Sequence, residues 1–480
     1  MNITKTTRSS KSIASLLNVY VWRANKASEA FCLAGQLTLQ DLGTGDANEL
    51  LASFKYSDEY LNSSESYPLD PINLPLRQGA VSTRHAFVAL GAIFDAAPDA
   101  WGRRVVQASE SQLLEDGSIY SRAFLRGADG IGAMLLKPAY GDDSIDELTR
   151  LVQWSRDERP TLGELNNAAL ATRRLEQSEG ISEEHKRLLA GSWTIGGARP
   201  KAIVRNEGTL PLSEALTGRS LIAKFPTINE SVDRSKIEWA CLRMARDMGF
   251  EVPGHALADV ATGTALLLER FDRYALSTAI SPLMEGRRHY ISANSLVSSL
   301  SDTKRLDTAH DKVTFSFGNL MSIAARVAAK PNQARSDMYA RLVLNTALHN
   351  TDDHLKNFGF LKDDNSRALH LSPVFDLSPQ GLGSHFVHLG DFGRRYNIRD
   401  VRGLSRSLGV AAGAAATIEE KILTVLERRS EYFEMADLAL NQRQAVEALI
   451  ASGTGGLLSP VGPAPLEELT PSTDAPGSQA

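Results

Sequence analysis

The spacing of apolar and polar residues divides the chain into a strand-rich part and a mainly helical part. Short β-branched, aliphatic or aromatic runs bounded by turn residues predict strands. These runs lie at 19–22, 34–39 and 52–56, and again at 201–204, 221–226 and 265–268. From about 280 to 450 the pattern is mainly helical, with one aliphatic segment after another. We therefore expect an α+β fold.

A polar cluster interrupts the helical part. An apolar run ending at Leu348 gives way to Asn350, Asp352, Asp353, His354 and Asn357, and an apolar strand follows. Asp352 and Asn357 are five residues apart, which is the spacing of the aspartate and asparagine in kinase catalytic loops. In that arrangement the aspartate accepts a proton from the attacking hydroxyl, and the asparagine amide oxygen helps to hold Mg²⁺. The alternative is a polar turn without chemical function.

The continuation of the chain favours the chemical interpretation. Residues 358–361 and 368–371 predict two strands joined by a turn, and the second strand leads to Asp376. Because a hairpin folds back on itself, Asn357 and Asp376 are expected to face one volume. An amide oxygen and a carboxylate, bridged by phosphate oxygens, suit Mg²⁺. The pattern therefore predicts a phosphotransfer site.

Lys224 lies inside an apolar strand. A lysine in such a position either lies on a sheet edge with its charge in water or, in kinase-like enzymes, reaches the ATP phosphates. The second interpretation requires a glutamate partner, and Glu238 on a predicted helix at 237–246 is the candidate. The residues expected to face the core from this helix are Trp239, Leu242 and Ala245.

Two further motifs carry less information. A glycine-containing loop before Lys201 could bring backbone N–H groups close to phosphate, but it lacks the Walker A and kinase glycine patterns, so a plain β-turn is the alternative. Asp391-Phe-Gly393 spells the kinase D-F-G motif, yet it lies 34 residues beyond Asn357, whereas Asp376 closes the hairpin directly. We expect Asp391 to be structural or near the substrate rim.

Composition restricts the class of protein. The chain has 480 residues, of which 42% are hydrophobic and 23% charged, as in a globular protein of two or three domains. Its formal net charge of −5 argues against DNA binding by charge alone, although a partner could bring DNA contact. Cys32 and Cys241 form no disulfide or zinc pattern. With no signal peptide or membrane-spanning run in the sequence, we expect a soluble cytoplasmic protein.

Five segments, in this order, resemble the HipA family of serine/threonine kinases, which serve as toxins of bacterial type II toxin–antitoxin systems. They are Thr194-Ile-Gly-Gly-Ala-Arg-Pro-Lys201, Ile222-Ala-Lys-Phe-Pro226, Glu269-Arg-Phe-Asp-Arg273, Thr351-Asp-Asp-His-Leu-Lys-Asn357 and Phe375-Asp376. The N-terminal stretches 74–79 and 94–104 match as well, so that the resemblance covers roughly residues 19 to 440. One departure is Arg287-Arg-His-Tyr-Ile-Ser292, where many relatives have R-x-H-x-E-D.

The resemblance implies a two-lobed, protein-kinase-like fold with a strand-rich N-terminal subdomain and a mainly helical C-terminal lobe. The predicted divisions are a flexible N-terminus at 1–18, a HipA-type N-terminal subdomain at 19–150, a kinase-like N-lobe with the nucleotide loop at 151–275, a helical C-lobe with the catalytic loop at 276–450 and a disordered tail at 451–480.

The resemblance also implies roles for individual residues. Asp352 would be the catalytic base, Asn357 and Asp376 would bind Mg²⁺, and Lys224 would bind the ATP phosphates. The other residues expected to bind ATP are Gly196, Gly197, Ala198, Arg199, Pro200 and Lys201 in the nucleotide loop, Glu269, Arg270 and Phe271 through their backbone beside the adenine, and His354 and Lys356. The family autophosphorylates a serine in the nucleotide loop, which ejects the loop and silences the kinase. Here Thr194 occupies the matching position, and Ser192 is nearby.

The partners implied by the resemblance are a protein substrate, such as an aminoacyl-tRNA synthetase, and a HipB-like helix-turn-helix antitoxin that links the kinase to DNA. No membrane contact is expected. Two other functions remain open at this point: a small-molecule phosphotransferase, which shares the Asp…Asn…Asp plan, and a catalytically idle corepressor that binds an antitoxin and DNA.

Overall fold

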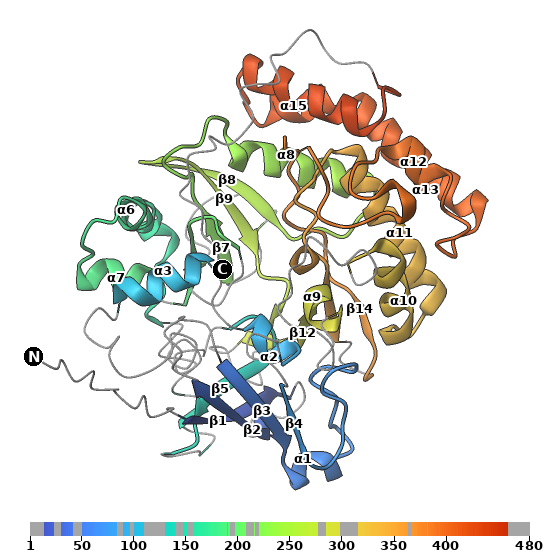
Figure 1. Ribbon diagram of the computed structural model, residues 1–480. Helices are drawn as coiled ribbons and strands as arrows, with labels where there is room; N and C mark the ends of the chain where they lie inside the picture. Colours follow the sequence, from blue (N-terminus) through green and yellow to red (C-terminus); the bar gives the residue numbers. More distant parts are fainter. Residues whose placement is uncertain are drawn as a thin grey trace, which may run out of the picture.

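The computed structural model describes residues 14–23, 30–41, 50–83, 90–96, 100–109, 130–140, 144, 147–148, 150, 157–189, 191–192, 197–207, 216, 220–276, 285–297, 315–362, 366–381 and 383–458, and the structural statements below concern these residues (Figure 1). Residues 1–13 of the predicted flexible N-terminus and residues 459–480 of the predicted tail lie outside them. The predicted domain boundaries stay predictions.

The N-terminal part is an antiparallel sheet in the order β4-β3-β2-β1-β5. Its strands are β1 (Ala14–Trp22), β2 (Phe31–Asp41), β3 (Leu50–Tyr56), β4 (Ala80–Ser82) and β5 (Met134–Pro138). Along β1, Val19 and Val21 are buried on one face, while Tyr20 and Trp22 are buried on the other. The three predicted strands are confirmed, but β1 starts earlier than expected. Residues 14–18 are paired with β2, so they are not part of a loose N-terminus.

Short helices accompany this sheet. They are α1 (Asp58–Asn62), α2 (Ala92–Asp95) and α3 (Ala100–Ser109). Helix α2 ends at Asp95 and α3 begins at Ala100, so the 94–104 stretch is divided between two helices. Pro98 lies between them in the sequence, and proline disfavours helical backbone in the residue before it. The buried indole of Trp101 in α3 donates to the carbonyl oxygen of Lys201 at 3.0 Å, which ties α3 to the next sheet.

The second sheet has the order β6-β7-β9-β8. Its strands are β6 (Lys201–Arg205), β7 (Ser220–Lys224), β8 (His255–Val260) and β9 (Gly263–Glu269). The elements η3 (Leu162–Glu164), α6 (Leu165–Glu176) and α7 (Glu183–Leu189) share a hydrophobic cluster with one face of this sheet. Helix α8 (Arg234–Asp247) packs on β8 and β9.

Helix α8 forms where the sequence predicts it, and the residues expected to face the core do so. The Asp233 side chain caps its first turn by accepting from the backbone N–H of Lys236 at 3.0 Å. Leu242 and Ala245 are buried as expected. Trp239 is partly buried and packs against the core cluster, with its ring edge-on to His255.

The C-terminal part is mainly helical, as the sequence predicts. Its helices are α9 (Ala293–Val297), α10 (Phe317–Val327), α11 (Pro331–Ala347), α12 (Ile398–Arg402), α13 (Ala412–Glu427), α14 (Arg429–Met435) and α15 (Leu440–Gly453). Inserted among them are two small sheets, β10 (Arg273–Ala275) with β11 (Glu285–Arg287), and β12 (Tyr290–Ser292) with β13 (Gly359–Lys362) and β14 (Leu369–Leu371). Figure 1 shows β7 to β9 between α3, α6 and α7 on one side and α10 to α15 on the other.

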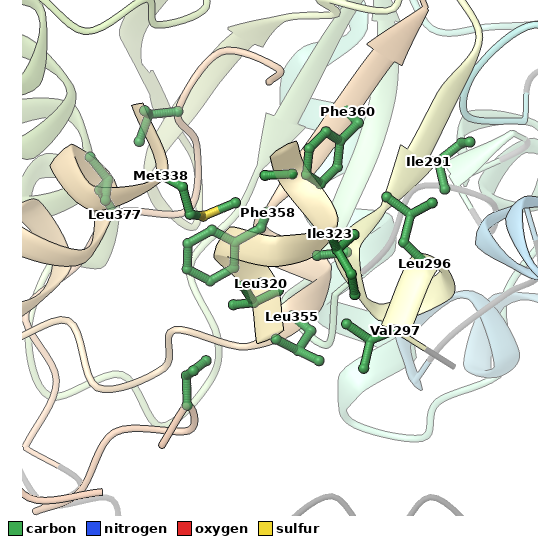
Figure 2. Packing of buried hydrophobic residues seen from close by; sticks show 14 of the residues in the cluster. Ile291, Leu296, Val297, Leu320, Ile323, Met338, Leu355, Phe358, Phe360 and Leu377 are labelled. Atoms are coloured by element: carbon green, nitrogen blue, oxygen red, sulfur yellow. The ribbon is translucent and has the colours of Figure 1, made fainter. Parts of the chain in front are cut away.

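One hydrophobic cluster joins the N-terminal sheet to the helical part. It runs from Val19 and Phe54 in the sheet through Ile93 in α2 to Leu296 in α9 and Met338 in α11. Figure 2 shows its helical end, where Phe358, Leu355 and Phe360 gather with Met338, Leu320 and Val297. The N-terminal sheet is therefore packed onto the part of the chain that carries the polar cluster. Among the described helices, none is long and apolar enough to cross a membrane.

Candidate active site

A cavity of about 530 Å³ opens between the β6–β9 sheet and the polar segment that follows α11. Four parts of the chain line it: the N-terminal subdomain, the glycine-containing loop before β6, the β7–α8–β9 unit and the segments around Asp352 and Asp376. A volume of this size is within the range of small-molecule sites. The predicted site residues on its wall are Gly197, Ala198, Arg199, Lys201, Lys224, Glu269, Phe271, Asp352, His354, Lys356, Asn357 and Asp376.

Lys224 is held inside the cavity by two carboxylates. Strand β7 lies between β6 and β9, so Lys224 is on a central strand and not on a sheet edge. Its Nζ donates to Oε1 of Glu238 at 2.7 Å and also to Oδ1 of Asp376. Burial acts to lower the pKa of Lys224, but Asp376 and Glu238 outweigh it and hold that pKa above its ordinary value. The side chain is therefore a cation at the cavity wall.

The polar segment turns sharply after α11. His349 has a φ of 54°, in the left-handed region, and the chain then passes Asp352 to the short helix η5 (Leu355–Asn357). The Asn357 side-chain N–H₂ donates to the backbone oxygen of Asp352 at 2.9 Å. This bond uses the amide nitrogen, which leaves the amide oxygen available to a ligand in the cavity.

Burial and neighbouring charges shift the pKa values of Asp352 and His354 at this turn. Partial removal from water raises the pKa of Asp352, and the negative charges of Asp376 and Asp353 add to the rise, while Arg234 opposes it. Asp352 nevertheless remains exposed at the cavity surface. Burial lowers the pKa of His354 to about 4, so its ring is neutral at neutral pH and its Nδ1 accepts from the backbone N–H of Lys356 at 3.2 Å.

The hairpin brings Asp376 beside this turn. Strands β13 and β14 pair antiparallel, with Phe360 opposite Leu371, so the chain leaving β14 returns toward the start of β13. Asn357 and Asp376 consequently line the same cavity, as the hairpin argument expects. Asp376 has a φ of 55°. Burial acts to raise its pKa, but Lys224 more than reverses this and holds the pKa below its ordinary value.

At the end of β9, Glu269 and Phe271 line the cavity, while Arg270 does not. Arg270 is buried with its guanidinium bound to Asp272 and to the carbonyl oxygen of Gly130. Its side chain therefore supports the chain turn, and the expected contact of the 269–271 backbone with adenine stays a prediction. Pro200 also lies outside the wall, where its carbonyl oxygen accepts from the backbone N–H of Phe225 at 2.9 Å.

The glycine-containing loop is described from Gly197 onward, and Gly196 and Thr194 lie outside the described residues. Gly197 has a φ of 102°, and a Cβ atom there would come within 2.6 Å of Nζ of Lys201. A side chain at this position would thus disturb a cation on the cavity wall. Ser192 is fully buried, and its hydroxyl donates to the carbonyl oxygen of Leu189 at 2.7 Å. The Ser192 hydroxyl is not presented to the cavity in this conformation.

Comparison with known proteins identifies the part of the chain that builds most of this site. Residues 193–429 match the family model of the HipA-like C-terminal domain. The chain carries a HipA-like C-terminal domain. The resemblance to the HipA family inferred from the sequence is thereby confirmed.

Curated relatives and a solved structure agree with this assignment. The chain is 26% identical over 336 residues to Y4mE of Sinorhizobium fredii, named as a candidate kinase, covering 68% of this chain and 71% of that protein. It is 30% identical over 183 residues to Y4dM of the same organism, also named as a candidate kinase, covering 35% of this chain and 40% of that protein.

A chain from the Shewanella oneidensis complex of HipA, HipB and operator DNA is similar in fold, with a TM-score of 0.57 and 17% identity over 92% of this chain and 96% of that one. The expected α+β, two-lobed, kinase-like fold is confirmed by this likeness.

The HipA-like domain is braced by a residue that the sequence analysis did not single out for a role. Asp353, next to Asp352, is buried and accepts hydrogen bonds from the backbone N–H groups of Phe386 at 2.6 Å and Val387 at 3.4 Å. It also contacts His385 Nδ1 at 3.2 Å, and the Tyr396 hydroxyl donates to it at 3.3 Å. Asp353 therefore fixes the 385–396 segment to the turn that carries Asp352.

The segment that Asp353 holds contains two histidines and the D-F-G letters. His385 and His388 are buried, and no described group of His, Cys, Asp and Glu side chains could hold a metal by three or more of them. Asp391 is exposed in η6 (Gly390–Phe392) and does not line the cavity. The letters D-F-G at 391–393 thus lie outside the wall of the candidate active-site cavity.

Several wall residues were missed because they come from distant parts of the sequence. They include Asp95, Ile131, Arg234, Tyr290, Ser292 and Gln380. Asp95 and Ser292 did carry a signal, since each falls in a stretch compared with the HipA family. Ile131 and Gln380 carried none, because nothing in their local sequence distinguishes them from ordinary loop residues.

Proposed function

We propose that this chain is an ATP- and Mg²⁺-dependent serine/threonine protein kinase of the HipA type. The observation that carries the proposal is the convergence of the Lys224–Glu238 pair with Asp352, Asn357 and Asp376 on one cavity. These are the groups that phosphoryl transfer from ATP requires: a cation for phosphate, a base near the acceptor and oxygen ligands for a divalent ion.

In this proposal Asp352 takes the proton from the acceptor hydroxyl as the acceptor oxygen bonds to the γ-phosphorus. The bond from the γ-phosphorus to the β–γ bridging oxygen breaks, and ADP leaves with the bonding electrons. Lys224 neutralises phosphate charge, and Glu238 keeps Lys224 in place. The raised pKa of Asp352 suits proton acceptance better than that of an ordinary aspartate.

The donor set suits Mg²⁺. Asn357 would offer its amide oxygen and Asp376 its carboxylate, and Mg²⁺ typically takes one or two protein oxygens with water and phosphate completing its shell. When bound, Mg²⁺ supplies charge neutralisation of the transferring phosphate. Asp376 forms an ion pair with the Lys224 ammonium, so its carboxylate is accessible to a cation in the cavity.

The apolar wall suits an adenine ring. Ile222, Leu268 and Phe271 lie on the cavity near the end of β9, where the backbone of Glu269 is also at the wall. The proposal assigns adenine to this position and the phosphates to the side of Lys224 and Lys201.

The biological context proposed is that of a toxin. The S. oneidensis structure with a similar fold is titled as a complex of HipA, HipB and operator DNA, which supports a HipB-like antitoxin and indirect DNA contact as proposals for this chain. The substrate is proposed to be a protein hydroxyl, for instance in a translation component such as an aminoacyl-tRNA synthetase.

A test is phosphotransfer from radiolabelled ATP and Mg²⁺ by the purified chain in a cell lysate. Wild type and Asp391→Asn, a matched change at an exposed aspartate outside the cavity, should label a protein band. Asp352→Asn should bind ATP but transfer nothing. Label on a small molecule would instead favour a small-molecule phosphotransferase, and ATP binding without any labelling would favour a corepressor. Equal transfer by Asp352→Asn would refute the assignment of the base.

A further inference from the structure

Asp95, the last residue of α2, brings a carboxylate of the N-terminal subdomain into the wall of the active-site cavity. Its Oδ2 accepts from the backbone N–H of Ser292 at 2.8 Å, and its Oδ1 accepts from the Ser292 hydroxyl at 2.6 Å. Both oxygens of the carboxylate therefore hold a single residue of the HipA-like domain. Burial raises the pKa of Asp95 to about 6, so the carboxylate is ionised at neutral pH.

Ser292 connects this carboxylate by backbone contacts to the segment that carries Asn357, the proposed Mg²⁺ ligand. It ends β12 and pairs with Gly359 of β13. The next residue, Ala293, donates its backbone N–H to the carbonyl oxygen of Phe358 at 2.7 Å. Phe358 and Gly359 directly follow Asn357 in the chain. The Ser292–Gly359 pair and the Ala293–Phe358 hydrogen bond therefore link the Asp95–Ser292 contact to the backbone next to Asn357.

The Ser292 hydroxyl has two roles that only some side chains can combine. It accepts the backbone N–H of Ser295 at 3.1 Å at the start of α9, and it donates to Asp95. A carboxylate at position 292 could accept from Ser295 but could not donate to Asp95. The hydroxyl at this position is therefore matched to Asp95 in this chain.

We propose that Asp95 is a positioning residue for the active site: through its two hydrogen bonds to Ser292 it holds β12, and with it the Lys356–Asn357 end of the catalytic turn, in place for Mg²⁺ and nucleotide. The inference rests on the proposed function of Asn357 as a Mg²⁺ ligand. It makes the N-terminal subdomain a working part of the nucleotide site. Groups that orient metal ligands typically change metal affinity or activity by about 10- to 100-fold when removed.

The purely structural alternative is that Asp95 only helps the two parts of the chain to pack. That alternative predicts a change in stability with no change in the Mg²⁺ requirement. The measurement that separates the two is therefore the Mg²⁺ dependence of binding of a fluorescent ATP analogue, followed by anisotropy, alongside phosphotransfer and the urea midpoint of unfolding.

The variants are Asp95→Ala, Ser292→Ala, Ser292→Asp and the double variant Asp95→Asn with Ser292→Asp. In the double variant the hydrogen bond is reversed, because the asparagine N–H₂ donates to the new carboxylate. Asp400→Ala is the control, since Asp400 likewise accepts a backbone N–H, from Asn397 at 2.9 Å, but lies outside the cavity.

Asp95→Ala and Ser292→Ala should raise the Mg²⁺ concentration needed for nucleotide binding by about 10-fold or more. Ser292→Asp should be at least as impaired, because it opposes two carboxylates, and the double variant should recover most of the loss. Asp400→Ala should lower the urea midpoint alone. Folded Asp95→Ala and Ser292→Ala proteins with the wild-type Mg²⁺ requirement would overturn the inference. If the wild-type protein binds nucleotide with Mg²⁺ but transfers no phosphate, the kinase function is refuted, while the Mg²⁺ requirements of the variants still test the role of Asp95. If the wild-type protein binds no nucleotide, both proposals are refuted.

Discussion

Replacement of Asp272 by asparagine should destabilise the protein more than any surface charge change. Asp272 is buried, and its carboxylate accepts from Arg270 Nε at 3.0 Å, Arg270 Nη2 at 2.7 Å and Arg273 Nη1 at 2.7 Å. It also accepts the backbone N–H of Gly132 at 2.7 Å. Burial acts to raise the pKa of Asp272, but the two arginines hold it well below its usual range. The same arginines donate to the carbonyl oxygen of Gly130, so this cluster joins the N-terminal subdomain to the end of β9.

The magnitude follows from the charges involved. Asparagine keeps the shape of the side chain but removes its charge, and it replaces one accepting oxygen by an N–H₂ that faces arginine donors. Two buried guanidinium groups then lose the carboxylate between them. Removing one partner of a buried ion pair costs about 3–5 kcal/mol. We expect the free energy of unfolding of Asp272→Asn to fall by about that amount.

The assay is equilibrium unfolding in urea at pH 7, followed by tryptophan fluorescence and far-UV circular dichroism, with coincident transitions required before a free energy is assigned. The control is Glu183→Gln, which removes the exposed i,i+3 pair with Lys186 and should leave the midpoint unchanged. An Asp272→Asn protein that unfolds at the wild-type midpoint would refute the reasoning, since the buried charges would then need no mutual compensation.

Three more outcomes are expected. Glu238→Gln weakens the hold on Lys224 and should reduce phosphotransfer by about 10- to 100-fold, the equivalent of losing one hydrogen bond to a charged group; unchanged steady-state kinetics would contradict this. Phe358→Ala opens a cavity in the cluster of Figure 2 and should cost about 3–5 kcal/mol in urea unfolding, whereas Phe392→Ala, at a side chain that is 44% exposed, should cost far less. Burial lowers the pKa of His289 from 6.5 to about 4. Between about pH 6.5 and 4 the imidazole is therefore protonated in the unfolded chain but neutral in the folded protein. The free energy of unfolding consequently falls as the pH drops through this range. His289→Gln should reduce that loss, measured by urea unfolding at pH 7 and pH 4.5, by up to about 3 kcal/mol, and an unaltered pH dependence would show that His289 is not the group responsible.

Predictions from the local sequence were correct where the geometry of one short segment determines the result. The hairpin that carries Asn357 and Asp376 was predictable, because strand–turn–strand geometry alone brings its two ends together. Lys224 was left between two interpretations, because an apolar strand with one lysine suits an edge as well as a central position. The sheet order decided this, by placing β6 and β9 on either side of β7.

Other features depend on contacts made elsewhere. Arg270 lies in a motif that suggests ligand binding, but the sequence contains no sign that Asp272 and Gly130 bind its guanidinium. Trp239 packs against the hydrophobic core, as its spacing in α8 predicts, but it is only partly buried and its ring is edge-on to His255. In both cases the partner is a residue whose distance in space cannot be derived from its distance along the chain.

The sequence by itself determined the secondary-structure pattern, the spacing of Asp352 and Asn357 and the resemblance to the HipA family, because each is a property of short segments. Only the tertiary structure decided that Asp95 of α2 contacts Ser292 at the cavity, and that Asp353 binds the 385–396 segment to the turn that carries Asp352. The physical reason is that a buried carboxylate needs donors from whatever packs against it. Which elements pack together is set by the shared hydrophobic core, and no local pattern specifies that.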